Sequence, residues 1–438
     1  IKTKCVSFEQ AMSRKIPKRH RPKKPNIFFR CLIRLLSIPD LLSARFSYTK
    51  HRIDEAGDGP YLILMNHSSF IDLKIAYKIL FPMAFGVICT SDGFVGKPWL
   101  MRQIGSIPTQ KFVTDTGLVK DMLYAIKNKK LSILMYPEAS YSFDGRATAL
   151  PSSLGKLIKK LNVPVMTIIT DGAFLREPLY NCLKKRSRVR VSARYECLLT
   201  KDEISEKTPD EINTILSDKF SFDHFKSQVE NGTEVAENFR ADGLERILYR
   251  CAACGCEGEM SGKGIKLTCK KCGKSYTMDT LGRLSADAGV TEFSHIPDWY
   301  AWQRECVCHE IASSEYILDT EVEIGILRDY SAIYMVGDGR LRHTADGFML
   351  DGCDGKLHYT QKPQASYGLY ADYFWYEIGD VICIGDKEAL YYCFPADGVP
   401  VAKARQAAEE LFKLTRQTRQ KQMGGACSVH SVGLLRRP

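Results

Sequence analysis

Two residues at the end of an apolar run have the types that a proton-transfer site needs. His67 follows the run YLILM at 61–65, and Asp72 comes five residues later. On one regular helix these side chains would point about 140° apart, because each residue turns the helix by about 100°. They can meet if His67 precedes a helix that begins near Asp72, with Ser68 or Ser69 as its N-cap. Asp72 would then fix the tautomer of His67 and leave the other ring nitrogen free as a general base.

Taken alone, this spacing is also consistent with a histidine that merely packs at the end of a strand. Four segments together resemble the PlsC-type glycerolipid acyltransferases, the family that includes the 1-acyl-glycerol-3-phosphate acyltransferases. The segments, in the order of that family, are NHSSFID at 66–72, GKPWLMRQIGSIPTQKF at 96–112, LSILMYPEASYS at 131–142 and NVPVMTII at 162–169. The resemblance covers about residues 50–200.

The resemblance implies transfer of a fatty acyl group from acyl-CoA or acyl carrier protein (acyl-ACP) to a lysophospholipid-type acceptor, foremost 1-acyl-sn-glycerol-3-phosphate. His67 would deprotonate the acceptor hydroxyl, and Asp72 would orient His67. Glu138 would shape the acceptor site, or would be a strand-end carboxylate bound by backbone donors. The expected phosphate contacts are basic side chains of the second segment: Lys111, Lys97 and Arg102.

The third segment departs from the family pattern at two positions. It reads PEASYS, so Ala139 stands in place of the usual glycine and Tyr141 in place of the usual arginine. A tyrosine cannot replace the bidentate contact that an arginine makes with phosphate. Either Arg146 or Lys111 takes over this contact, or the acceptor is not a simple glycerol phosphate.

Short apolar runs alternate with helical stretches between about residues 51 and 200. The runs, each long enough for one buried strand, lie at 61–65, 85–90, 131–136, 163–169 and 189–199. Such alternation is typical of an α/β layer structure. We therefore expect residues 51–248 to form an acyltransferase domain with a mixed sheet flanked by helices.

Two CxxCG pairs, separated by fourteen residues, predict a small zinc ribbon over residues 249–282. The predicted ligands are the four paired thiols of Cys251, Cys254, Cys269 and Cys272. Four protein thiolates leave no open position, so the zinc would be structural. Cys256 is a spare thiol that could compete as a ligand, and a redox or disulfide pair is the alternative. The remaining cysteines are scattered, which favours a reduced, cytoplasmic setting.

Residues 1–50 combine a basic arm with the apolar segment IFFRCLIRLLSI at 27–38. At helical spacing this segment has one narrow polar stripe, which consists of Asn26, Arg30, Arg34 and Ser37. The helix could pack on its own domain. It could instead lie in a membrane interface, with the arm on anionic headgroups.

Residues 283–313 are expected to be a linker, and residues 314–416 a β-rich domain that one helix closes. This element order is similar to that of pleckstrin-homology-like barrels, which could bind lipid headgroups or a partner protein, or simply pack on the enzyme. The basic tail at 417–438 is expected to be flexible.

The 438 residues carry a net charge of +11, which favours an anionic partner. No stretch of about 18 uncharged apolar residues is present, and the first 25 residues lack the apolar core of a secretory signal. We expect a cytoplasmic protein bound peripherally to the inner face of an anionic membrane. The rival hypothesis is a non-catalytic membrane or lipid-binding adaptor built on the same fold. Nucleic acid is not favoured as a partner, because no stacking or base-reading motif is present.

Overall fold

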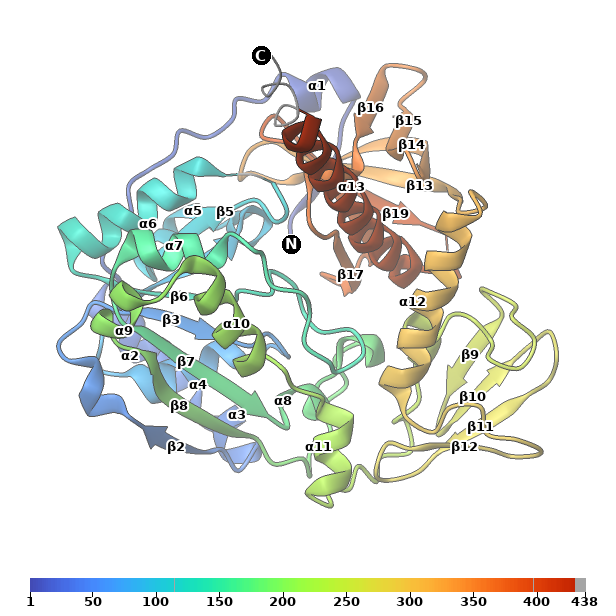
Figure 1. Cartoon of the computed structure of the whole chain (residues 1–438), viewed down its shortest axis with the longest axis horizontal. Coiled ribbons are helices and arrows are strands. Elements are labelled where there is room, and N and C mark those ends of the chain that lie inside the picture. The colour runs from blue at the N-terminus through green and yellow to red at the C-terminus, as the bar shows by residue number, and fades with distance from the viewer. Residues whose placement is uncertain (114, 397, 430–438) are drawn as a thin grey trace, which may run out of the picture.

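The computed structural model describes residues 1–113, 115–396 and 398–429 of the chain, with side chains in the last helix described as far as residue 417. Three sheets organise it, one for each globular part of the chain (Figure 1). The predicted tail at 417–438 begins inside that helix, which runs to Val429, and residues 430–438 lie outside the described part.

The first sheet has the strand order β2-β8-β7-β3-β6-β4-β5 and is parallel except for the antiparallel pair β7–β8. Its strands are β2 (Ser47–His51), β3 (Leu62–Met65), β4 (Phe85–Thr90), β5 (Ser106–Thr109), β6 (Ser132–Met135), β7 (Val165–Asp171) and β8 (Ser192–Leu199). Each of the five predicted apolar runs forms one of these strands, and the mixed sheet is confirmed.

Helices cover both faces of this sheet (Figure 1). They are α2 (Ile27–Leu36), α3 (Ile38–Ser43), α4 (Asp72–Leu80), α5 (Pro98–Gln103), α6 (Thr116–Lys129), α7 (Leu154–Leu161), α8 (Ala173–Arg176), α9 (Lys201–Glu206), α10 (Pro209–Lys219) and α11 (His224–Glu230). In β3, Ile63 and Met65 pack with residues of α3 and α4, whereas Leu62 and Leu64 pack with residues of α6 and α7. A strand buried on both faces explains the uninterrupted apolar run before His67.

The second sheet has the order β12-β11-β10-β9 and carries the cysteine pairs. Its strands are β9 (Met260–Lys263), β10 (Lys266–Cys269), β11 (Ser275–Met278) and β12 (Leu284–Ala286). Residues 283–313 are not a linker, because they contain β12 and the helix α12 (Ile296–Ala312). The buried residues of α12, among them Ile296, Trp299, Gln303, Val307 and Ile311, lie at helical spacing on one face. The apolar pattern is weak because this face includes the polar Gln303, while Trp302 and Cys306 lie outside it. Trp299 is fully buried against Tyr276 of β11.

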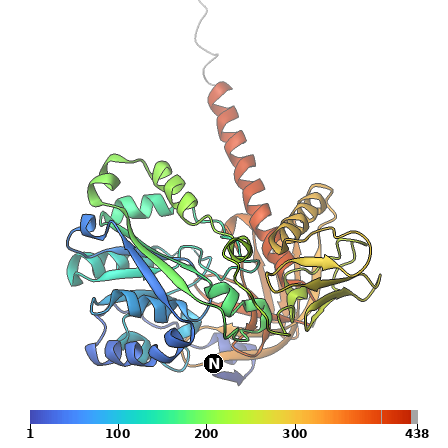
Figure 2. The ribbon, with the colours of Figure 1, turned by 90° about the horizontal axis from the view of Figure 1, so that it is seen from below.

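The third sheet has the order β16-β15-β14-β13-β19-β18-β17. Its strands are β13 (Leu318–Leu327), β14 (Ile333–Thr344), β15 (Gly347–Gly352), β16 (Leu357–Gln361), β17 (Tyr370–Trp375), β18 (Gly379–Gly385) and β19 (Leu390–Pro395). The predicted closing helix is α13 (Val401–Val429), which packs on this sheet and then extends away from the body (Figure 2). The short 3-10 helices are η1 (Ile53–Ala56), η2 (Ser91–Phe94), η3 (Leu179–Asn181), η4 (Leu244–Arg246) and η5 (Pro363–Ala365).

The N-terminal arm lies on the protein for much of its length. Its strand β1 (Thr3–Cys5) pairs in parallel with β14, and the helix α1 (Phe8–Met12) follows. Arg19 forms ion pairs with Asp115 and Asp121 at 2.8 and 2.5 Å. The arm therefore connects the β-rich domain to the acyltransferase domain, and only part of its charge is free for another partner.

Candidate active site and metal centre

The turn between β3 and α4 brings His67 and Asp72 together. Nδ1 of His67 lies 3.1 Å from Oδ2 of Asp72, and the same oxygen accepts the backbone N–H groups of Ser68 and Ser69 at 2.8 and 3.0 Å. An ionised carboxylate can only accept, so Nδ1 of His67 carries the hydrogen. Nε2 of His67 is therefore left without a hydrogen, as a base requires. The helix begins at Asp72 itself, and its N-cap is Ile71 rather than Ser68 or Ser69, so the predicted cap is wrong.

Two tyrosine rings enclose the imidazole of His67. Tyr136 stacks on it with ring centroids 4.0 Å apart, and Tyr141 stacks on it at 3.8 Å. The side chain of His67 is 16% exposed. Burial lowers the pKa of His67 well below 6.5, and the positive charge of Lys111 lowers it further. His67 is thus held in its neutral form.

Asp72 is also buried, and its Oδ1 has no hydrogen-bond partner among the described residues. Burial raises the pKa of Asp72 to about 7, although the backbone donors of Ser68 and Ser69 oppose this rise. The charge on the pair therefore changes close to neutral pH.

Glu138 accepts hydrogen bonds from two segments, the turn after β3 and the loop before α7. Its Oε1 accepts the N–H of His67 at 3.1 Å, and its Oε2 accepts the N–H and the hydroxyl of Thr148 at 3.1 and 3.2 Å. Burial raises the pKa of Glu138 to about 7. These bonds match the alternative of a strand-end carboxylate satisfied by backbone donors. Glu138 shapes the site by holding His67.

The three basic residues that were predicted to bind phosphate differ in their surroundings. Lys111 lies over the ring of Tyr370, 4.2 Å from its centroid, and is near enough to His67 to affect its pKa. Lys97, the N-cap of α5, and Arg102, in its last turn, form no ion pair with any residue in the described part of the chain.

Arg146 lies in a separate network. Its Nε donates to Asp223 at 3.0 Å, its Nη2 to Asp298 at 2.5 Å and its Nη1 to the carbonyl of Pro297 at 3.3 Å. All three guanidinium nitrogens are bound by the protein. Of the two cations considered for the place of the missing arginine, Arg146 is therefore already occupied by protein acceptors.

Three side chains at the site were not singled out in the sequence. Tyr136 faces His67, the ring Nε2 of His224 lies 3.2 Å from the hydroxyl of Ser68, and Arg405 of α13 binds the loop that carries Tyr141. Tyr136 could have been found, because it follows the apolar run of β6 directly. His224 and Arg405 carried no such signal, since each lies more than 150 residues from its contact.

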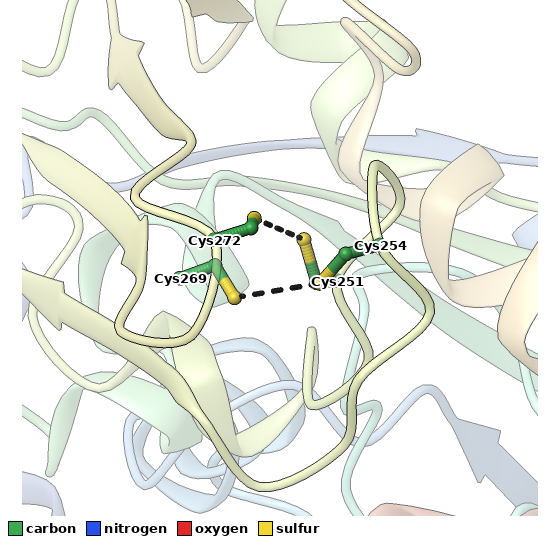
Figure 3. Close-up of side chains that lie close together, drawn as sticks. All are labelled: Cys251, Cys254, Cys269 and Cys272. Carbon is green, nitrogen blue, oxygen red and sulfur yellow. Dashed lines mark hydrogen bonds between the residues drawn. The ribbon is translucent and has the colours of Figure 1, made fainter.

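The four predicted thiols of Cys251, Cys254, Cys269 and Cys272 converge between two loops (Figure 3). All four sulfur atoms lie within 4.8 Å of one another. The Sγ atoms of Cys251 and Cys272 are 3.7 Å apart, and those of Cys254 and Cys269 are 3.8 Å apart. A tetrahedral site with Zn–S bonds of about 2.3 Å has sulfurs about 3.8 Å apart, whereas a disulfide requires about 2.05 Å.

The backbone supports this arrangement. Gly255 and Gly273 follow the two pairs with φ of 72° and 75°, a conformation that favours glycine, and their N–H groups donate to the carbonyls of Cys251 and Cys269 at 2.9 Å. The four cysteines could therefore hold a metal ion. Among the described residues, Cys256 does not join the metal-ligating group.

The helix α2 turns its apolar face outward. Arg30 and Ser37 of the polar stripe are buried, and Arg30 donates to the carbonyl of Pro82, so this part of the stripe faces the protein. Asn26, at the start of the stripe, is exposed. Exposed apolar residues that line α2, α3, α5 and the turn before α4 are Ile27, Phe28, Leu35, Leu36, Leu42, Phe70 and Trp99. Each of the seven is more than half exposed. Within the described residues, no helix is both long enough and apolar enough to cross a membrane.

Residues 45–171 match the sequence model of the Acyltransferase family. The matched part contains His67, Asp72 and Glu138, and the match agrees with the resemblance that the four sequence segments indicated. No curated protein matches the chain. Among solved structures, the 1-acyl-sn-glycerophosphate acyltransferase PlsC from Thermotoga maritima is similar, at 14% identity over 47% of this chain and 79% of that one. At a TM-score of 0.35, this similarity carries no functional information.

Proposed function

We propose that the protein transfers a fatty acyl group from acyl-CoA or acyl-ACP to a free hydroxyl of a glycerolipid acceptor, with 1-acyl-sn-glycerol-3-phosphate as the first candidate. The observation that carries this proposal is the bond between Nδ1 of His67 and Asp72, which leaves Nε2 as a free base. A neutral, buried imidazole suits proton removal from a hydroxyl.

In the proposed reaction, Nε2 of His67 takes the proton of the acceptor hydroxyl while its oxygen attacks the thioester carbonyl carbon. A new C–O bond forms, the C–S bond breaks, and the leaving thiolate takes the proton from the imidazolium. Asp72 stabilises this transient charge and fixes the tautomer. Lys111 is the proposed contact for an acceptor phosphate, with Lys97 and Arg102 as further cations.

We also propose that the protein works peripherally on the inner, cytoplasmic face of an anionic membrane. The outward apolar face of α2 supports this proposal, because exposed aromatic and aliphatic side chains can enter the boundary between headgroups and acyl chains. Exposed lysines such as Lys15, Lys18, Lys24 and Lys97 would add about 1 kcal/mol each near anionic lipid.

Zinc is the proposed ion for the four-cysteine site, because four thiolates in a tetrahedral arrangement suit it best among common metals. The ion would crosslink the two loops of the ribbon and take no part in acyl transfer.

The acceptor is tested with a radiolabelled acyl thioester and a panel of lysophosphatidate, glycerol 3-phosphate, lysophospholipids and a glycolipid. Labelled product from lysophosphatidate supports the first candidate, and product from another acceptor alone replaces it. Failure with every acceptor, using metal-replete protein on vesicles, favours the adaptor hypothesis. The altered third segment, with Ala139 and Tyr141, is the feature that keeps this hypothesis open.

Membrane binding is tested by flotation with vesicles that contain anionic lipid. We expect the double variant Leu35→Asp/Leu36→Asp to lose most binding, because both residues are more than 60% exposed on α2. Val290→Asp is the matched control, since Val290 is 74% exposed but lies beside the ribbon. Equal flotation of all three proteins would contradict this part of the proposal.

A further inference from the structure

The helix α13 of the β-rich domain reaches the loop that carries Tyr141. Nη2 of Arg405 donates to the hydroxyl of Ser140 at 2.9 Å, and its Nη1 donates to the carbonyl of Tyr141 at 3.1 Å. Its guanidinium lies over the ring of Phe143, 4.3 Å from the centroid. The side chain of Arg405 is only 4% exposed. The β-rich domain thus makes a buried, charge-assisted contact with the catalytic loop.

This loop has an unfavourable backbone conformation next to the contact. Ala139 has a φ of 56°, in the left-handed region where a Cβ atom costs about 1–2 kcal/mol. Its N–H donates to the carbonyl of Tyr136, and Ser140 and Tyr141 follow directly. Bonds from Arg405 to these two residues therefore restrain the chain just after the strained position.

The restrained loop in turn contacts the base. The ring of Tyr141 covers one face of His67, and the N–H of Ser142 donates to the carbonyl of His67 at 3.2 Å. Tyr136, on the other face, comes directly after β6 and is fixed by the sheet. Tyr141 has no such support from a strand. Its position depends on what holds the loop.

Arg405 is not a substitute phosphate ligand. Its Nε donates to Glu409 at 3.2 Å, so all three of its nitrogens already donate to the protein. We propose that Arg405 is a positioning residue, which holds Tyr141 against His67 and makes the β-rich domain a part of the catalytic unit. This inference rests on the proposed function, since it assumes that His67 is the base.

Other contacts keep the β-rich domain in place when Arg405 is changed. The hydroxyl of Tyr370 donates to Asp92 at 2.7 Å, and the rings of Phe143 and Tyr373 lie 4.4 Å apart. Arg405→Met should therefore loosen the loop without releasing the domain. Arg405→Lys retains the charge but cannot reproduce the forked contact with two acceptors. Ser140→Ala removes only one of the two acceptors and tests the same contact if Arg405→Met does not fold.

The first readout is the pKa of His67 from NMR titration of isotope-labelled histidines in the full chain, with His67 assigned by difference. Burial beneath Tyr141 lowers this pKa, so a loosened loop admits water and should raise it toward 6.5. The measurement needs no substrate. It therefore still reports on the loop if the proposed acyl transfer fails.

The second readout is steady-state kinetics with the acceptor that the wild type uses. We expect Arg405→Met to lower kcat by about 10²-fold with little change in KM, because a misplaced base costs rate more than binding. Arg405→Lys and Ser140→Ala should give smaller losses in the same direction.

Arg304→Met is the matched control, because Arg304 also binds α13, through ion pairs with Glu409 at 2.7 Å and Glu410 at 2.9 Å rather than with Ser140 or Tyr141. It should leave the pKa of His67 unchanged. An unchanged pKa and kcat in folded Arg405→Met would overturn the inference. Equal changes of the His67 pKa and of kcat in Arg304→Met would also overturn it, because they would mean that the docking of α13 alone matters.

Discussion

The ring of Tyr141 lies 3.8 Å, centroid to centroid, from the imidazole of His67 and covers one face of that ring. Tyr141 occupies the place where the family resemblance led us to expect an arginine. The substitution therefore does more than remove a charge, because the new ring shields His67 from water. An aromatic enclosure of this kind favours a neutral imidazole.

The pH dependence of acyl transfer should reflect the His67–Asp72 pair. His67 resists protonation, whereas the pKa of Asp72 is raised to about 7, so the pair takes up its first proton near neutral pH. A protonated Asp72 would donate to Nδ1 and place the ring hydrogen on Nε2, which removes the base. We expect kcat/KM to be constant above about pH 7 and to fall below it. Lys111→Met removes a positive charge that lowers the pKa of His67, and should therefore raise that pKa.

Asp72→Asn should lower kcat by about 10²–10⁴-fold, because an amide in this place favours the wrong tautomer of His67. The amide can also no longer accept both backbone N–H groups as a charged oxygen does. Thermal unfolding of the variant, measured alongside kcat, separates lost chemistry from lost structure. A kcat within about threefold of wild type would exclude an orienting role.

Glu138→Gln should weaken the catalytic turn, since an amide offers one acceptor where the carboxylate serves donors on both oxygens. Leaving one buried N–H without a partner costs about 1–3 kcal/mol of unfolding free energy. We expect a lower kcat and a lower unfolding midpoint, with an unchanged KM for the acceptor. A rise in that KM alone would instead indicate direct acceptor binding by Glu138.

Metal analysis should find one zinc ion per chain. Cys269→Ser should lower its affinity sharply, whereas Cys256→Ser should retain it, because Cys256 lies outside the cluster of four sulfurs. Chelation should lower the thermal unfolding midpoint, since Tyr276 of β11 packs on Trp299 of α12. Equal metal content in both variants would contradict the assigned ligands.

Local signals were sufficient for much of this architecture. The apolar run before His67 predicted β3, the serines after it predicted the turn, and the CxxCG pairs predicted four converging thiols. Long-range contacts had no such signal. The bond from Arg405 to Ser140 joins residues 265 positions apart. The periodicity of α2 predicted a polar stripe that includes Arg30, but it could not show that Arg30 is buried and that the apolar face points outward.

The central claim is that His67 is the general base of an acyl transfer, and the most direct test compares wild type with His67→Ala. Both proteins, matched in metal content and unfolding midpoint, are given a radiolabelled acyl thioester and lysophosphatidate on anionic vesicles. The account predicts labelled product with wild type and none above background with the variant. Undiminished transfer by folded His67→Ala would contradict it.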